Sequence, residues 1–378
     1  MTRAEVIVRA SEGKIRWVDA AAILRVSPRH LLRLRAVHEK GGEEALLDGR
    51  NGPRKKRVKA KTVADVLRLK RERYADFSVK HFHEQLTEKH GFRISYTWTK
   101  QLLQGAGLAE KSSGRGKYRR KRERRPLPGM MVHLDGSTHE WIRGQPARDL
   151  ILMLDDANGK PLWGKFVEQE GTLSTLEAVD AVLRKYGRFS ELYTDRGSHF
   201  CRTTRVGSAP DEQQDGQVAR ALRSLGIRQI LARSPQARGR GERAFGTIQG
   251  RLPQELRAAG IDDYDDANRY LQQTFLPDYA RRFGVKPLQS GSAFLSVVGL
   301  DLELELSIHH QRIVRADSTV AFAGLLLQLP PGPGGAHYAR CPVTVHEVLN
   351  GTLVVSRDGR RLARFDRAGD LLSLRRAA

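Results

Sequence analysis

An Asn158-Gly159 pair between two apolar segments is the feature that most restricts how this chain can fold. The segments LILMLDD and KPLWGKFV flank the pair, and Asn-Gly is the dipeptide that best fits the two-residue turn of a β-hairpin. Residues 150–170 are therefore predicted to form two antiparallel strands.

The segments around the hairpin predict a mixed α/β domain. MMVHLDGS, residues 130–137, alternates so that His133 and Asp135 share one face of a strand. After the hairpin we expect a helix that ends at Gly187, a strand that ends near Gly197, a helix at about 211–225, a strand at 227–232 and a helix that starts near Glu242. Three antiparallel strands followed by helix, strand, helix, strand and helix make the ribonuclease H-like layout, a mixed sheet with flanking helices.

Three acidic residues are expected to meet at one end of that sheet. Asp135 ends the first strand, Asp195 ends the fourth within ELYTDRGSHF, and Glu242 begins the last helix. Three adjacent carboxylates repel one another unless cations lie between them, and oxygen ligands suit Mg²⁺. A pair of such ions activates a water or a 3′-hydroxyl and stabilises the leaving oxygen of an in-line displacement.

Each acidic residue also has a plain structural interpretation. Asp135 can cap a turn, and Glu242 can complement the dipole of its helix, an effect worth about 0.3 to 1 kcal/mol. Asp155 and Asp156 are the best rival ligands, although their place before Asn158-Gly159 indicates a role in the turn. The metal site is favoured because the three acids occur together, in this order, on a basic chain.

The chain is strongly basic, and most of the excess lies in its first third. The net charge is +23, which implies a polyanionic partner, nucleic acid before membrane. Residues 1–127 carry 33 Lys and Arg against 14 Asp and Glu, whereas residues 128–378 carry 33 against 29. The N-terminal third is therefore the expected nucleic-acid-binding part.

Residues 17–38 predict a helix-turn-helix. Ser27 caps a second helix that begins at Pro28. The apolar side of the first helix is expected to carry Val18, Ala21, Ala22 and Leu24, and one side of the second Leu31, Leu34 and His38. The N-terminal residues of such a second helix meet DNA bases in the major groove, and the basic residues projecting from it are Arg29, Arg33 and Arg35. The alternative is a helical hairpin with solvated arginines.

A second helical unit follows the first basic linker. The linker, NGPRKKRVKAK at residues 51–61, includes Lys55, Lys56 and Arg57 and is expected to touch DNA phosphates. Residues 62–110 carry apolar residues at helical spacing and a helix cap at Ser95 or Thr97, which suits a second helix-turn-helix. His81 and His83 lack further ligands at a suitable spacing, so we expect them in the core or at the surface rather than on a metal.

The second basic linker is KSSGRGKYRRKRERRPL, residues 111–127. It contains nine basic residues and one acidic residue, and its centre is Arg119, Arg120, Lys121 and Arg122. A run of this kind is usually a solvated, flexible linker. Between DNA-reading helices and a catalytic domain it could also follow a phosphate backbone.

The chain after Pro277 is expected to be β-structured. The segments 302–332 and 343–365 predict short strands separated by Asn350-Gly351 and Asp358-Gly359 turns, and together they suggest a small SH3-like barrel.

The cysteine pattern and the hydropathy exclude other classes of protein. Cys201 and Cys341 form neither a disulfide framework nor a zinc pattern. No apolar run is long enough to span a bilayer, and the N-terminus lacks the layout of a secretion signal, so we expect a cytoplasmic protein that is not bound to a membrane.

HLDGS, LYTDRGSHF and SPQARGRGERAFGTIQGRL together resemble the integrase-core DDE transposases of bacterial insertion sequences, relatives of retroviral integrases, and are most similar to the group filed as not classified yet, ISNCY. The resemblance covers essentially the whole chain, and 46 residues separate Asp195 from Glu242. It implies that Asp135, Asp195 and Glu242 are catalytic and bind two Mg²⁺ ions, with Mn²⁺ as a substitute. It also implies cleavage at the transposon's 3′-ends and their transfer to target DNA.

The resemblance implies partners as well. The expected partner is double-stranded DNA, both the terminal inverted repeats and the target, held by a homo-oligomer in the bacterial cytoplasm at the nucleoid. Related enzymes often carry a DNA-contacting lysine seven residues after the acidic residue of the last helix. This chain has Gln249 there, and Arg251 or Arg243 could take the role instead.

The expected architecture is multidomain α/β. Its parts are a helix-turn-helix domain at 1–50, a linker at 51–61, a second helix-turn-helix domain at 62–110, a linker at 111–127, a ribonuclease H-like catalytic core at 128–285 and a small SH3-like β-barrel at 286–378. Two other functions share these features. One is a catalytically silent DNA-binding regulator derived from a transposase, and the other is a ribonuclease H-like nuclease without strand transfer, which has little use for two DNA-reading units.

Overall fold

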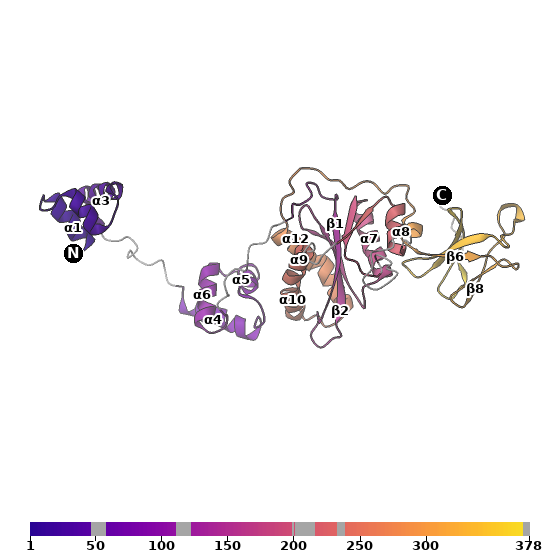
Figure 1. Cartoon of the computed structure of the whole chain (residues 1–378). Helices are drawn as coiled ribbons and strands as arrows, with labels where there is room; N and C mark the ends of the chain where they lie inside the picture. The colour runs from indigo at the N-terminus through magenta and orange to yellow at the C-terminus, as the bar shows by residue number, and fades with distance from the viewer. Residues whose placement is uncertain (47–57, 111–121, 199, 201–215, 233–238, 373–378) are drawn as a thin grey trace. The chain divides into compact units, whose positions relative to one another are not determined.

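The structure is a computed structural model that describes residues 1–46, 58–110, 122–198, 200, 216–232 and 239–372. It divides into two compact units, Met1–Arg68 and Leu69–Ala378. The division falls inside helix α4, Ala60–Glu72. Each unit is described by itself below, with the element labels of Figure 1.

The first unit is helical. Its helices are α1 (Arg3–Ser11), α2 (Trp17–Leu24) and α3 (Pro28–Gly41). The hydroxyl of Ser27 accepts a hydrogen bond from the backbone N–H of His30 at 3.3 Å, so the predicted cap is confirmed. The small core contains Leu31 and Ala20, and α1 completes it with Val6 and Ala10. The prediction that Val18 and Ala22 line the apolar side of α2 is wrong, because α1 packs on the side that carries Ala20 and leaves both residues exposed.

The second unit begins with two further capped helices, α5 (Val79–Glu88) and α6 (Tyr96–Gly105). Ser78 caps α5, and Ser95, one of the two predicted candidates, caps α6 by accepting from the N–H of Trp98 at 3.2 Å. Tyr74, Phe82 and Leu86 are fully buried here. The predicted helices are therefore present, while their use as a DNA-binding motif remains a prediction.

A five-stranded mixed sheet follows, as the order of patterns predicted. Its strands are β1 (Val132–His139), β2 (Arg148–Asp155), β3 (Pro161–Val167), β4 (Glu191–Thr194) and β5 (Arg228–Leu231). They lie in the order β3-β2-β1-β4-β5. The first three are antiparallel, and β4 and β5 run parallel to β1. The β2-β3 connection contains Asn158-Gly159, with Gly159 at φ +67°, so the predicted hairpin is confirmed.

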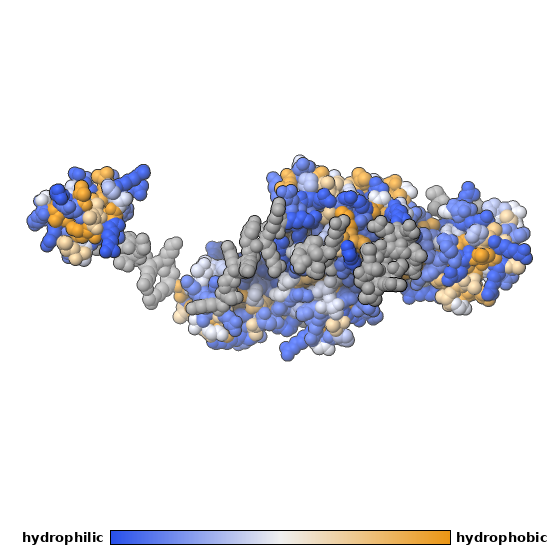
Figure 2. Space-filling model, in the orientation of Figure 1, coloured by the Kyte–Doolittle hydropathy of each residue, from blue (hydrophilic) through white to orange (hydrophobic). Residues whose placement is uncertain are grey.

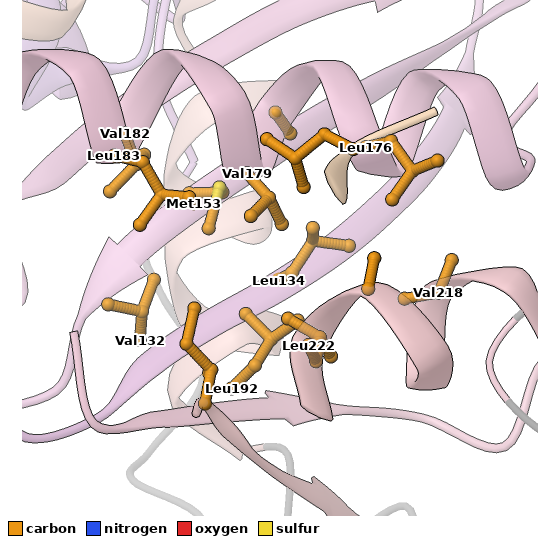
Figure 3. Close-up of a cluster of buried hydrophobic side chains, with 14 of the residues drawn as sticks. Val132, Leu134, Met153, Leu176, Val179, Val182, Leu183, Leu192, Val218 and Leu222 are labelled. Carbon is orange, nitrogen blue, oxygen red and sulfur yellow. The ribbon is translucent and has the colours of Figure 1, made fainter. Parts of the chain in front are cut away.

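Helices cover both faces of the sheet. Helices α7 (Thr172–Tyr186) and α8 (Gln217–Ser224) pack on one face. Figure 3 shows side chains of this layer, including Leu134, Val179, Leu192 and Leu222. The predicted start of α8 near residue 211 lies outside the described residues. On the other face lie α9 (Gly239–Gln249), α10 (Leu252–Ala259), α11 (Tyr264–Tyr270) and α12 (Leu276–Phe283).

The alternation of side chains along β1 decides which helices meet the acidic residues. Leu134 belongs to the core under α7 and α8. His133 and Asp135 point the opposite way, because neighbouring residues of a strand face opposite sides of the sheet. Leu152, the register partner of Asp135, belongs to the core under α9 to α12. Asp135 therefore faces the helix that carries Glu242.

The helices after α10 differ from the sequence prediction. A π-helical segment, Leu271–Phe275, joins α11 to α12. Pro277 lies just after this segment, where the N–H of Leu276 bonds to the carbonyl of Leu271, five residues earlier, so the regular i→i−4 pattern is already interrupted where proline lacks an N–H. The helix continues to Phe283, so the change to β-structure that was predicted after Pro277 begins only with β6 at Ile308.

Two amide side chains from this helical region cover β3, an outer strand of the sheet. Asn268 accepts from the N–H of Phe166 and donates to its carbonyl, and Gln272 donates to the carbonyl of Gly164. The strand edge is thereby hydrogen-bonded without a further strand.

The C-terminal part is mostly β-structured. The strands β6 (Ile308–Ile313), β9 (Pro342–Glu347), β10 (Leu353–Arg357), β11 (Arg360–Phe365) and β12 (Leu371–Leu372) form one sheet in the order β12-β11-β10-β9-β6. The strands β7 (Thr319–Phe322) and β8 (Leu325–Gln328) form a separate hairpin. Among the described residues the strands do not close into a barrel, so the SH3-like barrel is not confirmed.

Turn geometry and a local hydrogen bond explain why one sequence prediction in the C-terminal part is right and another is wrong. The Asp358-Gly359 turn is confirmed, with both residues at positive φ as a type I′ turn requires. LELE, by contrast, is not a strand but the helix α13, Leu302–Glu305. The Asp301 carboxylate caps α13 by accepting from the N–H of Leu304, and this local bond overrides the alternating pattern.

The surface of the described residues is mostly hydrophilic on the face shown in Figure 2. None of their helices is both long enough and apolar enough to cross a bilayer.

Candidate active site

Two of the three predicted acidic residues occupy neighbouring positions on adjacent parallel segments. The prediction that Asp135 ends the first strand is wrong, because β1 continues to His139, whereas Asp195 directly follows β4. In the β1-β4 register, Val132 pairs with Leu192 and His133 with Tyr193. Continuing that register by two residues sets Asp195 beside Asp135, and adjacent strands lie about 4.8 Å apart. Both residues are half-buried. One carboxylate oxygen of Asp195 accepts from the N–H of Gly197 at 2.8 Å, which fixes the turn after β4.

The helix that carries Glu242 approaches β1 through a glycine. A Cβ atom at Gly241 would lie only 2.8 Å from Oδ2 of Asp135, closer than such atoms pack. The first turn of α9 therefore comes against the Asp135 carboxylate because residue 241 has no side chain. Glu242, the next residue, is exposed.

The chemistry of these three side chains suits a hard divalent cation. Carboxylate oxygens are the ligands that Mg²⁺ prefers, and the half-buried pair lies where a third carboxylate enters from α9. Among the described residues, however, no three His, Cys, Asp or Glu side chains are gathered closely enough to hold a metal ion. Glu170 is another nearby carboxylate. It lies against Gly136, which faces the opposite side of the sheet from Asp135.

The three candidates for the DNA-contacting position differ in availability. The side-chain amide of Gln249 donates to the hydroxyl of Ser137 on β1 at 2.9 Å. The Arg251 guanidinium is buried against Glu84, 2.6 Å away. Arg243 is exposed, with Nε bonded to the carbonyl of Gly239 at 2.8 Å. Of the two arginines, Arg243 is therefore the more accessible to DNA.

The break in this helix follows from its sequence. Helix α9 ends at Gln249, and α10 begins at Leu252 with Pro253 in its first turn. Proline is tolerated in the first turn but not in a helix interior, so the two helices meet at Gly250 and Arg251.

The two rival acids have different roles. Asp155 is a turn residue, as predicted, because its carboxylate accepts from the N–H groups of Gly129, Ala157 and Asn158 at 2.8 to 3.2 Å. Burial raises the pKa of Asp155 despite these hydrogen bonds, which oppose the shift. Neither the hydrogen bonds of Asp155 nor its raised pKa indicates that this residue binds a metal.

Asp156 instead forms the centre of a buried ion-pair cluster that the sequence did not predict. Its carboxylate binds His133 Nε2 at 2.6 Å, Arg122 Nη2 at 2.5 Å and the guanidinium of Arg240, and it accepts from the N–H of Arg125 at 2.7 Å. Burial opposes ionisation, but these partners together hold the pKa of Asp156 well below its usual range. The cluster joins the end of the second basic linker to β1 and to the first turn of α9. Its members are far apart in sequence, so no local pattern signals it.

The predicted DNA-binding residues of α3 are all exposed. The guanidinium of Arg35 pairs with Glu39 at 2.7 Å and lies 5.2 Å from the centre of the Trp17 ring. The predicted DNA-binding residues Lys55, Lys56, Arg57, Arg119, Arg120 and Lys121 lie outside the described residues, and Arg122 is the one linker residue of that set within them.

The two histidines of α5 have structural partners. The buried His81 ring lies 2.9 Å from Oε1 of Glu255, and the His83 ring lies 3.0 Å from the hydroxyl of Thr99. Burial lowers the pKa of His83.

Comparison with known proteins gives two clear sequence relatives. No protein-family model matches the chain. A protein of Sinorhizobium fredii named as a transposase, y4bF, is 33% identical over 329 residues, which cover 85% of this chain and 71% of that protein. The transposase for insertion sequence IS1202 of Streptococcus pneumoniae is 24% identical over 321 residues, covering 75% of this chain and 69% of that protein.

Solved structures give weaker likenesses. A chain of the simian T-cell lymphotropic virus intasome in complex with PP2A regulatory subunit B56 gamma is 14% identical, with a TM-score of 0.35 over 71% of this chain and 88% of that one. The catalytic core domain of HTLV-2 integrase in complex with magnesium is 19% identical, with a TM-score of 0.30 over 39% of this chain and 89% of that one. These scores are too low to establish a common fold.

Proposed function

This chain belongs to a family of bacterial transposases, and we propose that it binds the terminal inverted repeats of an insertion sequence, cleaves their 3′-ends and joins them to target DNA as an integrase-core DDE enzyme. The observation that supports this most is the adjacency of Asp135, within β1, and Asp195, directly after β4, with α9 against Asp135. Two adjacent carboxylates and a helix that brings a third suit phosphoryl transfer.

Asp135, Asp195 and Glu242 are proposed as the ligands of two Mg²⁺ ions, or of Mn²⁺ in their place. When bound, such ions activate the attacking oxygen and offset the charge on the leaving oxygen. Other residues of the chain position these ligands and the DNA. Gly197 orients Asp195 through its N–H, and Gly241 allows α9 to lie against Asp135. The exposed Arg243 is placed to neutralise a DNA phosphate beside Glu242.

The proposed reaction has two displacements at phosphorus. In the first, a water oxygen bonds to the phosphorus at the transposon end, the P–O bond to the transposon's 3′-oxygen breaks, and that oxygen leaves as a 3′-hydroxyl. In the second, the same 3′-hydroxyl attacks a phosphorus of the target DNA, and a target 3′-hydroxyl leaves. Because two ends must be joined to one target, we propose that the active species on DNA is a homo-oligomer.

The proposal is tested with the full chain, DNA that carries its own flanking ends, and Mg²⁺, followed by mapping of the nicks. Cuts at the repeat termini are expected from the native protein. Asp135→Ala and Asp195→Asn should bind the same DNA and leave it uncut. Cleavage by Asp195→Asn would overturn the proposal. Binding without cleavage by all three proteins would instead establish the alternative, a catalytically silent DNA-binding regulator.

A further inference from the structure

A cavity of about 690 Å³ opens beside the candidate active site, between α9, α12 and the turn after β2. One of its lining residues is His133, which lies two residues before Asp135 on the same face of β1. Another is Arg240, two residues before Glu242 on α9. The cavity and the three acidic residues therefore share one side of the sheet, and about two strand residues, roughly 7 Å, separate His133 from Asp135 along β1.

One side of the cavity is formed by arginine side chains, and Asp156 holds most of them in place. The arginines that line it are Arg122, Arg124, Arg240 and Arg243. Asp156, fully buried, binds the guanidinium groups of Arg122 and Arg240, and its backbone carbonyl accepts from Arg124 at 2.8 Å. Four guanidinium groups face two carboxylates, those of Asp155 and Asp156, so a positive excess remains. Because Asp156 already orders three of these arginines, an anion that bound there would cost little side-chain entropy.

The other side of the cavity is apolar and partly aromatic. It is formed by Tyr279, Phe283 and Val285, of which Phe283 and Val285 are exposed. The rings of Tyr279 and Phe283 lie 4.8 Å apart, and the Arg251 guanidinium lies 4.9 Å from the centre of the Phe283 ring. An exposed aromatic ring beside arginines is suited to a flat group that carries a phosphate, since bases stack on such rings and phosphates bind such arginines. The volume also lies within the usual range for small-ligand sites.

We propose that this cavity binds one unpaired nucleotide of the DNA substrate, with its base against Phe283 and Val285 and its phosphate on Arg240 and Arg243. The inference rests on the proposed function for its premise that the ligand is DNA. A base within an intact duplex is stacked and paired on its edges, so only a nucleotide released from the stack enters such a cavity. The cavity therefore selects DNA that is opened next to the bond to be cut.

The test compares two DNA duplexes of one sequence, one fully paired and one with a single unpaired 2-aminopurine nucleotide. Binding of the full chain is measured in EDTA, where no cleavage occurs, by anisotropy and by 2-aminopurine fluorescence. We expect about tenfold tighter binding of the duplex with the unpaired nucleotide, since stacking of one base on an aromatic side chain accounts for such a factor. The fluorescence of the probe should rise in the complex, because the base leaves the neighbouring bases that quench it.

Variants locate the effect. Phe283→Ala should remove the preference while binding the paired duplex as the native protein does, and Phe283→Leu, which keeps the apolar packing, should reduce it. Leu288→Ala, at an exposed apolar residue outside the cavity, is the matched control and should keep the preference. An equal preference in the native protein and in Phe283→Ala would overturn the proposal, and so would the absence of any preference in the native protein.

Two further measurements distinguish DNA from free nucleotides as the ligand and separate this inference from the proposed function. Free dAMP should not displace the DNA probe at concentrations near the DNA dissociation constant, and displacement there would show a site for free nucleotides instead. Cleavage by Asp195→Asn with Mg²⁺ would refute the proposed function without changing the binding results in EDTA. The two ideas can therefore fail separately.

Discussion

Nε2 of His133 lies 2.6 Å from Oδ1 of Asp156, and both side chains are almost fully buried. His133 lies two residues before Asp135, and Arg240, bound to the same carboxylate, lies two residues before Glu242. One buried carboxylate thus ties β1 to the first turn of α9, the two elements that carry two of the three candidate catalytic residues. Asp156 is a positioning residue in this arrangement.

Asp156→Ala should destabilise the protein and impair cleavage. Removing one partner of a buried ion pair costs about 3 to 5 kcal/mol, because the remaining charges stay buried without compensation. We expect a clear fall in the denaturation midpoint, with Asp156→Asn intermediate because an amide oxygen still accepts hydrogen bonds. Chemical denaturation of the full chain measures this. The control is Asp358→Asn, which preserves the type I′ turn and should leave the midpoint unchanged. A native-like midpoint in Asp156→Ala would show that the cluster contributes nothing.

Gly241→Ala should impair the reaction more than it impairs folding. The new Cβ would lie 2.8 Å from Oδ2 of Asp135, so the carboxylate or the helix has to move. A displacement of about 1 Å at reacting groups can lower a rate about 100-fold. We expect a large loss of nicking with Mg²⁺ at unchanged DNA affinity.

Gly246→Ala is the matched control on the same helix, since a Cβ there meets nothing within 4 Å. It should cut normally and be more stable by about 0.5 to 1 kcal/mol, because alanine favours a helix over glycine. Equal nicking rates in the two alanine variants would show that the contact between α9 and Asp135 does not matter.

The sequence predicted what depends on local signals. The Asn158-Gly159 hairpin, the helix that ends at Gly187 and the Ser27 cap all follow from nearest neighbours along the chain, and the strand order then followed from general topology. Contacts between distant residues could not be predicted this way. The Asp156 cluster joins residues up to 118 positions apart, so the sequence alone indicated only a turn role for Asp156.

Two sequence patterns predicted the wrong secondary structure, because a local hydrogen bond or the local helix geometry decided the conformation instead. Asp301 turned an alternating segment into helix α13, and a π-helical segment allowed the helical run to continue through Pro277. In the candidate site, the adjacency of Asp135 and Asp195 follows from parallel pairing of predicted strands. The approach of α9 depends on Gly241, whose close contact no sequence pattern reveals.

The ion pairs that join α5 and the segment before it to the helices of the core should differ in strength according to their burial. Glu84 lies 2.6 Å from Arg251 and 3.1 Å from Arg282, and all three side chains are nearly buried. Asp76 and Arg257 form a pair at a solvent-exposed position. Double-mutant cycles to alanine should give a coupling of about 0.5 to 3 kcal/mol for Glu84 and Arg251. For Asp76 and Arg257 the expected coupling is about 0 to 1 kcal/mol. Equal couplings would contradict the argument from burial.

The buried His346 should make the stability of the C-terminal part depend on pH. Its ring lies 2.9 Å from the hydroxyl of Ser307 and 2.7 Å from that of Ser356. Burial, aided by the nearby charges of His309, Arg220 and Arg361, lowers the pKa of His346 to about 4, while a weaker effect of the Leu304 carbonyl opposes this. Burial also lowers the pKa of His309.

The sign of the effect follows from proton uptake. An unfolded histidine titrates at about 6.5, so below that pH the unfolded chain binds a proton that the folded chain does not. The contribution of His346 is therefore complete above about pH 6.5 and is lost as the pH falls toward 4. Between pH 7.5 and pH 5 the free energy of unfolding should fall by about 2 kcal/mol from this residue alone.

Denaturant titrations at pH 7.5 and pH 5 measure this fall. His346→Gln should be less stable at pH 7.5 and lose this part of the pH dependence, whereas His38→Gln, at a half-buried surface position in the first unit, should retain it. An unchanged pH dependence in His346→Gln would show that His346 is already charged in the folded protein.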